Sequence, residues 1–271
     1  MTHAFDFLTA EERALSARFR DDGFIVAPAE DRAALDAIRG HLAELAADWL
    51  GLSGPVDAGR LLDRIGDHVP VARLNEFRLA MIAGLNAAPW VRPAYFSVAR
   101  RTLSTVVGNE LCMQRRLNLS IQLPGDDSSL LPVHADTWSG DSPFEAVLWI
   151  PLVDCYRSKS MFLLPPAPNA ALMRDFGRFA ATSVDEMFAA IEPDLRWMEV
   201  PYGSFLLFNQ NLAHGNRVNA EADARWTMNC RFKGVFTPYA DKKLGEFFEP
   251  VTLRAASRIG LDYEYPAGFH E

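Results

Sequence analysis

The hydrophobic pattern divides the chain into a helical first part and a second part of short strands. Over the first hundred residues, apolar positions recur every three or four residues, as on the buried side of amphipathic helices. Thr9 with Glu12 fits a capping box, and Gly23 is expected to end the helix that starts there. An apolar run at 24–28 predicts one strand. The helices expected from this spacing cover residues 9–22, 31–50, 58–65, 74–85 and 93–107.

In the second part the period of the pattern changes to two. Apolar and polar residues alternate from 117 to 123, which predicts a strand within 111–123 whose polar face carries Asn118, Ser120 and Gln122. Ser183 with Glu186 predicts the start of an inserted helix. The other strands are expected at residues 146–153, 161–164, 204–208 and 225–236.

Helices followed by short strands and turns predict one domain, with a mainly β core of the sandwich or barrel type and an N-terminal helical layer. We expect residues 1–108 to be mostly helical support and 109–240 to form the β core. A helical insertion is expected near 168–192, and residues 241–271 form a C-terminal segment.

Composition excludes some classes of function. The formal net charge of the 271 residues is −8, with no basic tract, so we expect no general binding of nucleic acid. Neither a membrane span nor a signal peptide is apparent. Cys112, Cys155 and Cys230 lack zinc-finger spacing and are expected to be buried free thiols. Together these features predict a cytoplasmic protein that acts on a small molecule.

Three residues form a candidate metal site. His134 and Asp136 are two positions apart, so in an extended segment both side chains point to the same side. His214 follows an apolar strand 78 residues after Asp136. Two imidazoles and one carboxylate on one face of an ion suit an iron(II) enzyme, although zinc accepts the same ligands. The other histidines are expected at the surface (His41, His68) or near the termini (His3, His270).

A candidate anion site follows the last of these ligands. Arg225 lies eleven residues after His214 and begins an alternating segment in which Thr227, Asn229 and Arg231 share its face. A guanidinium binds a carboxylate through two parallel hydrogen bonds, and a threonine hydroxyl adds another donor. The alternative is a surface strand with ordinary charges.

Contacts to a substrate are less specific in the sequence. Arg116, Lys159 and Arg231 are cations near the predicted site strands that could bind an anionic group, or they could be ordinary surface charges. Trp138 follows Asp136 by two residues and could stack on a sugar ring or pack in the core.

In the order and spacing of these motifs the chain resembles the phytanoyl-CoA dioxygenase-like group of iron(II)/2-oxoglutarate oxygenases. The similarity extends over most of the chain and rests on residues 8–26, His134-Ala135-Asp136, 148–152, 203–208 with His214, and Arg225. A narrower resemblance, to oxygenases encoded within surface-carbohydrate gene clusters, rests on residues 118–129, 134–145 and 151–156.

The resemblance implies a double-stranded β-helix, the cupin-like form of the jelly roll. Iron(II) would be bound by His134, Asp136 and His214, and the far carboxylate of 2-oxoglutarate by Arg225 and Thr227. Gln122 and Asn118 would contact its other end. With O2, the enzyme would hydroxylate a C–H bond of a sugar, a sugar-linked compound or another small polar metabolite, releasing succinate and CO2. Asp136 favours hydroxylation over halogenation, because halogenating relatives lack this carboxylate.

The chain also departs from the group. Residues 159–161 and 165–169 replace its usual Asn-Gly and Pro-Gly-Ser-His segments, so phytanoyl-CoA is not the expected substrate. Asn216 stands where relatives often have serine.

Two alternatives remain open at this point. One is a cupin-like metal-dependent sugar isomerase or epimerase, and the other is a non-catalytic carbohydrate-binding jelly roll. Arg225 distinguishes the oxygenase from both alternatives, because neither alternative requires a site for 2-oxoglutarate.

Overall fold

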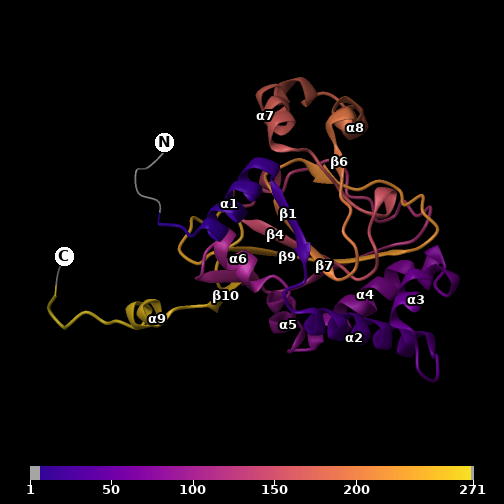
Figure 1. Ribbon diagram of the computed structural model, residues 1–271, viewed down its shortest axis with the longest axis horizontal. Helices are drawn as coiled ribbons and strands as arrows, with labels where there is room; N and C mark the ends of the chain where they lie inside the picture. Colours follow the sequence, from indigo (N-terminus) through magenta and orange to yellow (C-terminus); the bar gives the residue numbers. More distant parts are fainter. Residues whose placement is uncertain (1–6, 270–271) are drawn as a thin grey trace.

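The computed structural model describes residues 7–269 and has two antiparallel sheets there, with helices on both sides (Figure 1). The two terminal histidines, His3 and His270, lie outside the described residues. The helices are α1 (Ala10–Asp22), α2 (Arg32–Leu50), α3 (Ala58–Asp63), α4 (Val71–Ala87), α5 (Val91–Ser97), α6 (Arg100–Val106), α7 (Pro166–Arg174), α8 (Val184–Ile191) and α9 (Ala255–Leu261). The strands are β1 (Phe24–Pro28), β2 (Leu111–Gln114), β3 (Asn118–Gln122), β4 (Ala146–Pro151), β5 (Phe162–Leu163), β6 (Arg196–Trp197), β7 (Ser204–Asn209), β8 (His214–Gly215), β9 (Arg225–Gly234) and β10 (Phe248–Thr252).

The start and end of α1 follow the local signals in the sequence. Thr9 Oγ1 accepts a hydrogen bond from the Glu12 amide at 3.2 Å, and the Glu12 carboxylate accepts one from the Thr9 amide at 2.7 Å. Gly23 ends the helix at a φ of 82°, a left-handed conformation that glycine adopts without steric cost. A Cβ at this position would lie only 2.3 Å from Leu212 Cδ1, so the Leu212 side chain would have to move.

The prediction of one helix over 93–107 was wrong. The segment forms α5 and α6, separated at Val98 and Ala99. The Glu30 carboxylate, which lies about seventy residues earlier, accepts hydrogen bonds from the amides of Arg101 (2.6 Å) and Thr102 (2.9 Å) at the start of α6. This capping interaction comes from a distant part of the chain, so local periodicity does not reveal it.

The larger sheet has the order β1-β7-β4-β9-β2-β10, with β3 also paired to β9. The strand expected over 111–123 is therefore interrupted. Met113 pairs with Phe232, and Asn118 pairs with Asn229. The four residues between Met113 and Asn118 therefore lie opposite only two residues of β9. The extra residues form an exposed turn that includes Arg115 and Arg116.

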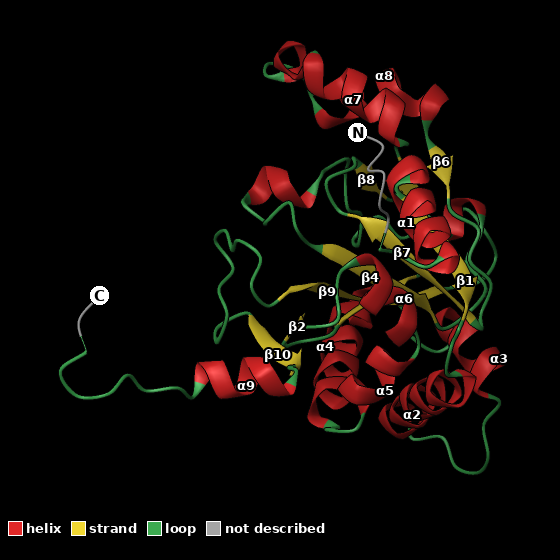
Figure 2. Cartoon of the chain, turned by 60° about the vertical axis from the view of Figure 1, so that its left-hand side comes forward, coloured by secondary structure: helices red, strands yellow, loops and turns green. Residues whose placement is uncertain are grey.

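The smaller sheet has the order β6-β5-β8 and lies beside the inserted helices α7 and α8 (Figure 2). The capping box predicted for the insertion is present, because Ser183 Oγ accepts from the Glu186 amide and Glu186 accepts from the Ser183 amide. Strands β6, β8 and β10 and helix α9 were not predicted. β6 and β8 have two residues each, which is too short for an alternating pattern. The whole is a jelly-roll-like arrangement of helices and antiparallel sheets.

Helices α2, α4 and α5 cover one face of the larger sheet, on the side opposite α7 and α8 (Figures 1 and 2). Phe77 of α4 is fully buried between Trp49 and Trp226, with ring centroids 5.1 and 5.7 Å away. The Tyr95 hydroxyl donates to the Leu148 carbonyl of β4 at 2.6 Å. Even-numbered β9 residues thus pack on the helices, which leaves the odd-numbered ones for the other face.

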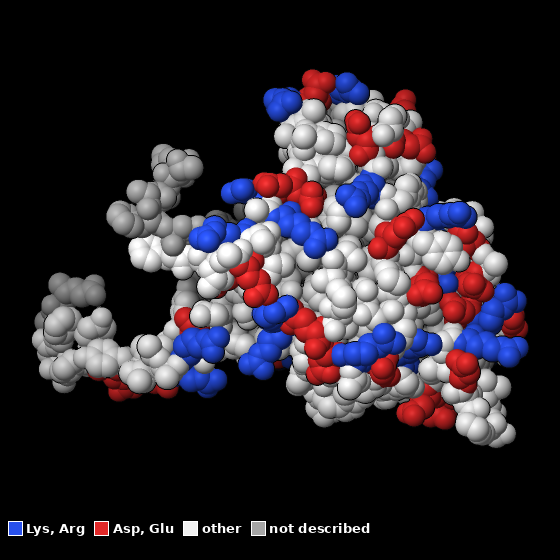
Figure 3. Space-filling model, viewed as in Figure 1, with Lys and Arg blue, Asp and Glu red and all other residues white. Residues whose placement is uncertain are grey.

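Cys112, Cys155 and Cys230 are buried and free, as expected. Burial raises the pKa of Cys155 and of Cys230 to about 12, so both thiols are protonated at neutral pH. Positive and negative side chains are interspersed over the face shown in Figure 3. None of the helices formed by residues 7–269 combines the length and apolar character needed to cross a bilayer.

Phe77→Ala should lower the free energy of unfolding by about 3–5 kcal/mol, because the cavity would separate the helical layer from β9. Leu79→Ala on the same helix is the matched control. Leu79 is 57% exposed, and its truncation should change the free energy of unfolding by less than about 0.5 kcal/mol. Urea denaturation of both variants measures the difference. Equal losses would contradict this account of the core.

Candidate metal centre and adjoining pocket

The three predicted ligands come together through backbone pairing. His134 forms a β-bridge with His214: each amide donates to the other residue's carbonyl, at 3.0 and 2.8 Å. Asp136 begins a short 3-10 helix, Asp136–Ser139, and its amide donates to the Gln210 carbonyl at 3.1 Å. Residues almost eighty positions apart are therefore held side by side by main-chain hydrogen bonds.

The side chains converge on one point. Asp136 Oδ1 lies 3.5 Å from His134 Nε2 and 4.0 Å from His214 Nε2. One ligand atom from each of the three residues lies within 4.8 Å of those from the others. The Nδ1 atoms point the other way, 2.8 Å from the carbonyls of Pro132 and Leu212. These carbonyls favour a proton on Nδ1 and turn both Nε2 atoms toward Asp136 Oδ1, the usual orientation of metal-binding histidines.

Gly215, next to His214, is required by close packing. A Cβ there would lie 2.6 Å from the Leu131 carbonyl oxygen and 2.9 Å from Phe162 Cζ. Asn216 then donates its amide to the Leu131 carbonyl (2.9 Å), while its Oδ1 accepts from the Leu131 amide (2.6 Å). The Asn216 side chain thus holds the loop that precedes His134.

Burial and mutual contacts set the charge of the ligands. Burial lowers the pKa of His214 to about 4, and nearby His134 adds to the effect. Burial acts to raise the pKa of Asp136, but the His134 hydrogen bond and the Arg231 charge outweigh it and hold the pKa well below its usual value. For His134, burial acts to lower the pKa, but hydrogen bonds to Asp136 and Pro132 raise it overall. Neutral His214 and ionised Asp136 are in the states that metal binding requires.

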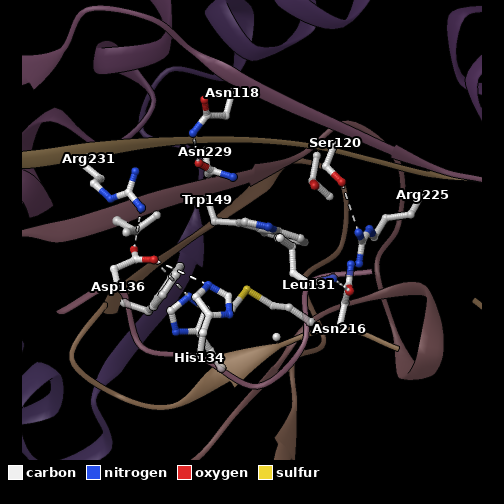
Figure 4. Close-up of a pocket in the computed structure, with 16 residues that line it drawn as sticks. Asn118, Ser120, Leu131, His134, Asp136, Trp149, Asn216, Arg225, Asn229 and Arg231 are labelled. Carbon is white, nitrogen blue, oxygen red and sulfur yellow. Dashed lines mark hydrogen bonds and ion pairs between the residues drawn. The ribbon is translucent and has the colours of Figure 1, made fainter. Parts of the chain in front are cut away.

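A pocket of about 250 Å³ opens beside these ligands (Figure 4). Its walls come from odd-numbered residues of β9, from β3, β4, β7 and β8, and from the loops around the candidate ligands. It is lined by Asn118, Ser120, Leu131, His134, Asp136, Val147, Trp149, Met161, Phe208, His214, Gly215, Asn216, Arg225, Thr227, Asn229 and Arg231.

Arg225 is a buried cation in this pocket. Its Nη1 donates to the Ser160 carbonyl at 2.9 Å and its Nη2 to Ser120 Oγ at 3.2 Å, while the buried Nε has no partner. Burial lowers the pKa of Arg225 to about 10, which leaves it protonated at neutral pH. Among residues 7–269 no carboxylate forms an ion pair with its guanidinium. An uncompensated buried charge is costly, and a bound anion would compensate it.

The other residues expected around 2-oxoglutarate divide into two groups. Thr227 and Asn118 line the pocket, and Asn118 Nδ2 donates to Asn229 Oδ1 at 2.8 Å. Gln122 does not line it. Its side chain is fully buried, and Nε2 donates to the Arg217 carbonyl at 2.9 Å. The placement of Gln122 therefore does not support a contact with the cosubstrate.

Three of the residues expected to bind substrate lie away from the pocket wall. Arg116 is exposed in the turn between β2 and β3. Lys159 is buried, but its Nζ pairs with Asp63 Oδ1 at 2.7 Å. Trp138 packs against Phe176, with ring centroids 4.8 Å apart. Arg231 does line the pocket, yet its Nη2 lies 2.9 Å from Asp136 Oδ2.

Some lining residues carried no sequence signal. Trp149 and Val147 lie on β4, where six consecutive residues are buried, so the pattern did not indicate which of them face a pocket. Asn229 did have a signal, because it alternates with Arg225 and Thr227, but it was not assigned a role.

The metal-free protein should lose stability as the pH falls from 6.5 to 4. The pKa of folded His214 is about 4, below its ordinary 6.5, so in this interval the unfolded chain binds the proton more tightly. The loss approaches about 1.4 kcal/mol per pH unit. Urea denaturation of wild type and His214→Asn across this interval measures it. His134 and Glu145, whose pKa values are raised, act in the opposite sense but are present in both proteins, so the difference between the two slopes gives the contribution of His214. Identical slopes in the two proteins would contradict the assignment.

No protein-family model and no curated protein matches the chain. Solved structures do match it over most of its length. ThoJ, a non-haem monooxygenase, is matched as a nickel complex (16% identity, 90% of this chain, 85% of that chain, TM-score 0.56) and in the apo form (15%, 89%, 84%, 0.57). HygX from Streptomyces hygroscopicus, solved with nickel and 2-oxoglutarate, is matched at 17% identity over 88% of this chain and 90% of its own, with a TM-score of 0.51. The chain therefore has the fold of these proteins, in agreement with the architecture expected from its sequence.

Proposed function

We propose that the protein is a non-haem iron(II)/2-oxoglutarate-dependent oxygenase that hydroxylates a small polar metabolite. The observation that carries this proposal is the presence of two sites in one pocket. A His-Asp-His set suits a divalent metal ion, and Arg225 presents a buried cation that lacks an anionic partner within residues 7–269. The fold shared with ThoJ and HygX agrees with it. We also propose that the two sheets form a double-stranded β-helix.

His134, Asp136 and His214 would hold iron(II) on one side and leave its other positions open. The carbonyls of Pro132 and Leu212 orient the two imidazoles, which keeps both Nε2 lone pairs directed at the ion. Bound iron(II) and 2-oxoglutarate would together supply the oxidation by O2, with release of succinate and CO2.

Arg225 and Thr227 would bind the far carboxylate of 2-oxoglutarate. The buried guanidinium has an unpartnered Nε, and Ser120 and the Ser160 carbonyl fix its orientation. Binding the carboxylate would remove the cost of an uncompensated charge, so the pocket should prefer a dianion to a neutral ketone. Asn118, held by Asn229, would contact the other end of the cosubstrate.

The substrate is proposed to be a sugar, a sugar-linked compound or a similar polar metabolite. The pocket combines apolar walls, Trp149 and Leu131, with neutral polar groups that can bind hydroxyls. Because Arg116 and Lys159 lie elsewhere and Arg231 is already paired, the part of the substrate that enters the pocket is proposed to be uncharged.

A cupin-like isomerase or a carbohydrate-binding jelly roll would share the fold and, for the isomerase, the metal. Neither requires a buried, unpaired arginine beside the metal ligands. This placement of Arg225 favours the oxygenase.

Anaerobic iron(II) followed by 2-oxoglutarate should give the weak visible charge-transfer band of the chelate. His134→Ala should abolish the band. Arg225→Ala should raise the dissociation constant of 2-oxoglutarate about 10–100-fold, since charge-assisted hydrogen bonds to the carboxylate are lost. Titration of the band measures these constants.

Arg217→Ala is the matched control. Arg217 is a half-exposed arginine whose guanidinium pairs with Asp185 outside the pocket. Its removal should leave the dissociation constant of 2-oxoglutarate unchanged. A wild-type protein that binds iron(II) but gives no band with 2-oxoglutarate would contradict the oxygenase function and favour the isomerase.

A further inference from the structure

Arg231 lies on the pocket face of β9, but its guanidinium is directed at protein acceptors (Figure 4). Nη2 lies 2.9 Å from Asp136 Oδ2 and 3.4 Å from Asp141 Oδ2. Nε donates to Gln210 Oε1 at 3.1 Å, and lies 3.9 Å from Glu145 Oε2. The side chain is 16% exposed. A substrate anion could reach this cation only by displacing existing contacts.

Asp136 uses its two carboxylate oxygens for different purposes. Oδ1 faces the Nε2 atoms of His134 and His214. Oδ2 forms an ion pair with Arg231 Nη2. The carboxylate is therefore held with a single oxygen toward the point where the imidazoles converge, which suits coordination of a metal through one oxygen only.

Arg231 is itself held by a buried network. The side chains of Asp141 and Glu145 are 2% and 1% exposed, and Lys242 Nζ lies 2.5 Å from Asp141 Oδ1. Gln210 Nε2 donates to Glu145 Oε2 and to the Ser142 carbonyl, both at 3.1 Å. The main-chain carbonyl of Gln210 also accepts a hydrogen bond from the Asp136 amide. Gln210 thus connects the main chain of Asp136 with the guanidinium that holds its side chain.

We propose that Arg231 is a positioning residue of the metal centre, which holds Asp136 Oδ2 so that only Oδ1 is presented to the metal. The inference rests on the metal site of the proposed function and is independent of 2-oxoglutarate. It assigns Arg231 a role different from the substrate contact expected from the sequence. Gln210 and Asp141 keep the guanidinium in place.

The planar guanidinium is needed for this arrangement. Its Nη2 and Nε reach Asp136 and Gln210 at the same time, in a fixed relative direction. A lysine ammonium would retain the charge but could not reproduce this fork. Arg231→Lys therefore separates positioning from simple charge compensation, and avoids leaving the buried carboxylates without a cation.

The test uses cobalt(II) alone, bound anaerobically to the full chain. Arg231→Lys should raise the cobalt(II) dissociation constant about 10–100-fold, the range found when a group that orients a metal ligand is lost. The visible ligand-field spectrum of bound cobalt(II) should also change, because Asp136 is free to reorient. A purely structural role would lower the free energy of unfolding without altering the spectrum of the folded protein.

Arg217→Lys is the matched control, since it makes the same change at an arginine that pairs with Asp185 and does not line the pocket. It should leave cobalt(II) affinity and spectrum unchanged. If Arg231→Lys does not fold, Gln210→Met removes the acceptor for Arg231 Nε and carries the same two expectations at smaller amplitude.

Wild-type affinity and spectrum in the folded variant would overturn the proposal. Its failure is distinguishable from failure of the oxygenase function. A wild type that binds cobalt(II), but gives no charge-transfer band with iron(II) and 2-oxoglutarate, would refute the function and leave the role of Arg231 to be decided by the cobalt(II) data.

Discussion

The backbone pairing of His134 with His214 is the interaction on which the site depends. Two main-chain hydrogen bonds join residues eighty positions apart and bring both imidazoles to the same side. The pairing requires Gly215, because a Cβ there would collide with the Leu131 carbonyl. The convergence of the three candidate ligands is thus a consequence of how the loop before Asp136 pairs with β8, so the backbone sets their relative geometry.

The second constraint is the placement of charge on one face of β9. Arg225 and Arg231 are three alternations apart on the same strand, yet their surroundings differ. Arg231 is compensated by buried carboxylates, including that of Asp136. Among the residues that the structure describes, Arg225 has only neutral partners, the Ser160 carbonyl and the Ser120 hydroxyl. One arginine therefore completes the protein's own charge network, while the other is the residue we propose to bind an anion.

The helices that pack on the opposite face of β9 keep both arginines on its pocket face. Trp226 and the other even-numbered residues of β9 pack against the helical layer, where Phe77 lies between Trp226 and Trp49. A slip of one residue in the pairing of β9 with β4 would turn the arginines into the core, which is prohibitively costly. The apolar packing on one face thereby holds the polar face in register over the pocket.

The sequence alone predicted the three candidate ligands that the fold brings together, the alternating face of β9 and the capped starts of α1 and α8. Each of these depends on residues close together in the chain, or on residue types that few other positions offer. It also predicted the helical layer over a β core, because the period of the hydrophobic pattern changes near residue 110.

Only the tertiary structure decided which polar residues face the pocket. Gln122 shares a strand face with Asn118 and Ser120 but is fully buried beside Arg217, and Lys159 pairs with Asp63. The break between α5 and α6 depends on capping by distant Glu30. Arg225 and Arg231 are the same residue type in the same pattern, and only the carboxylates that fold around Arg231 distinguish them. Electrostatic partners come from any part of the chain, so local sequence cannot specify them.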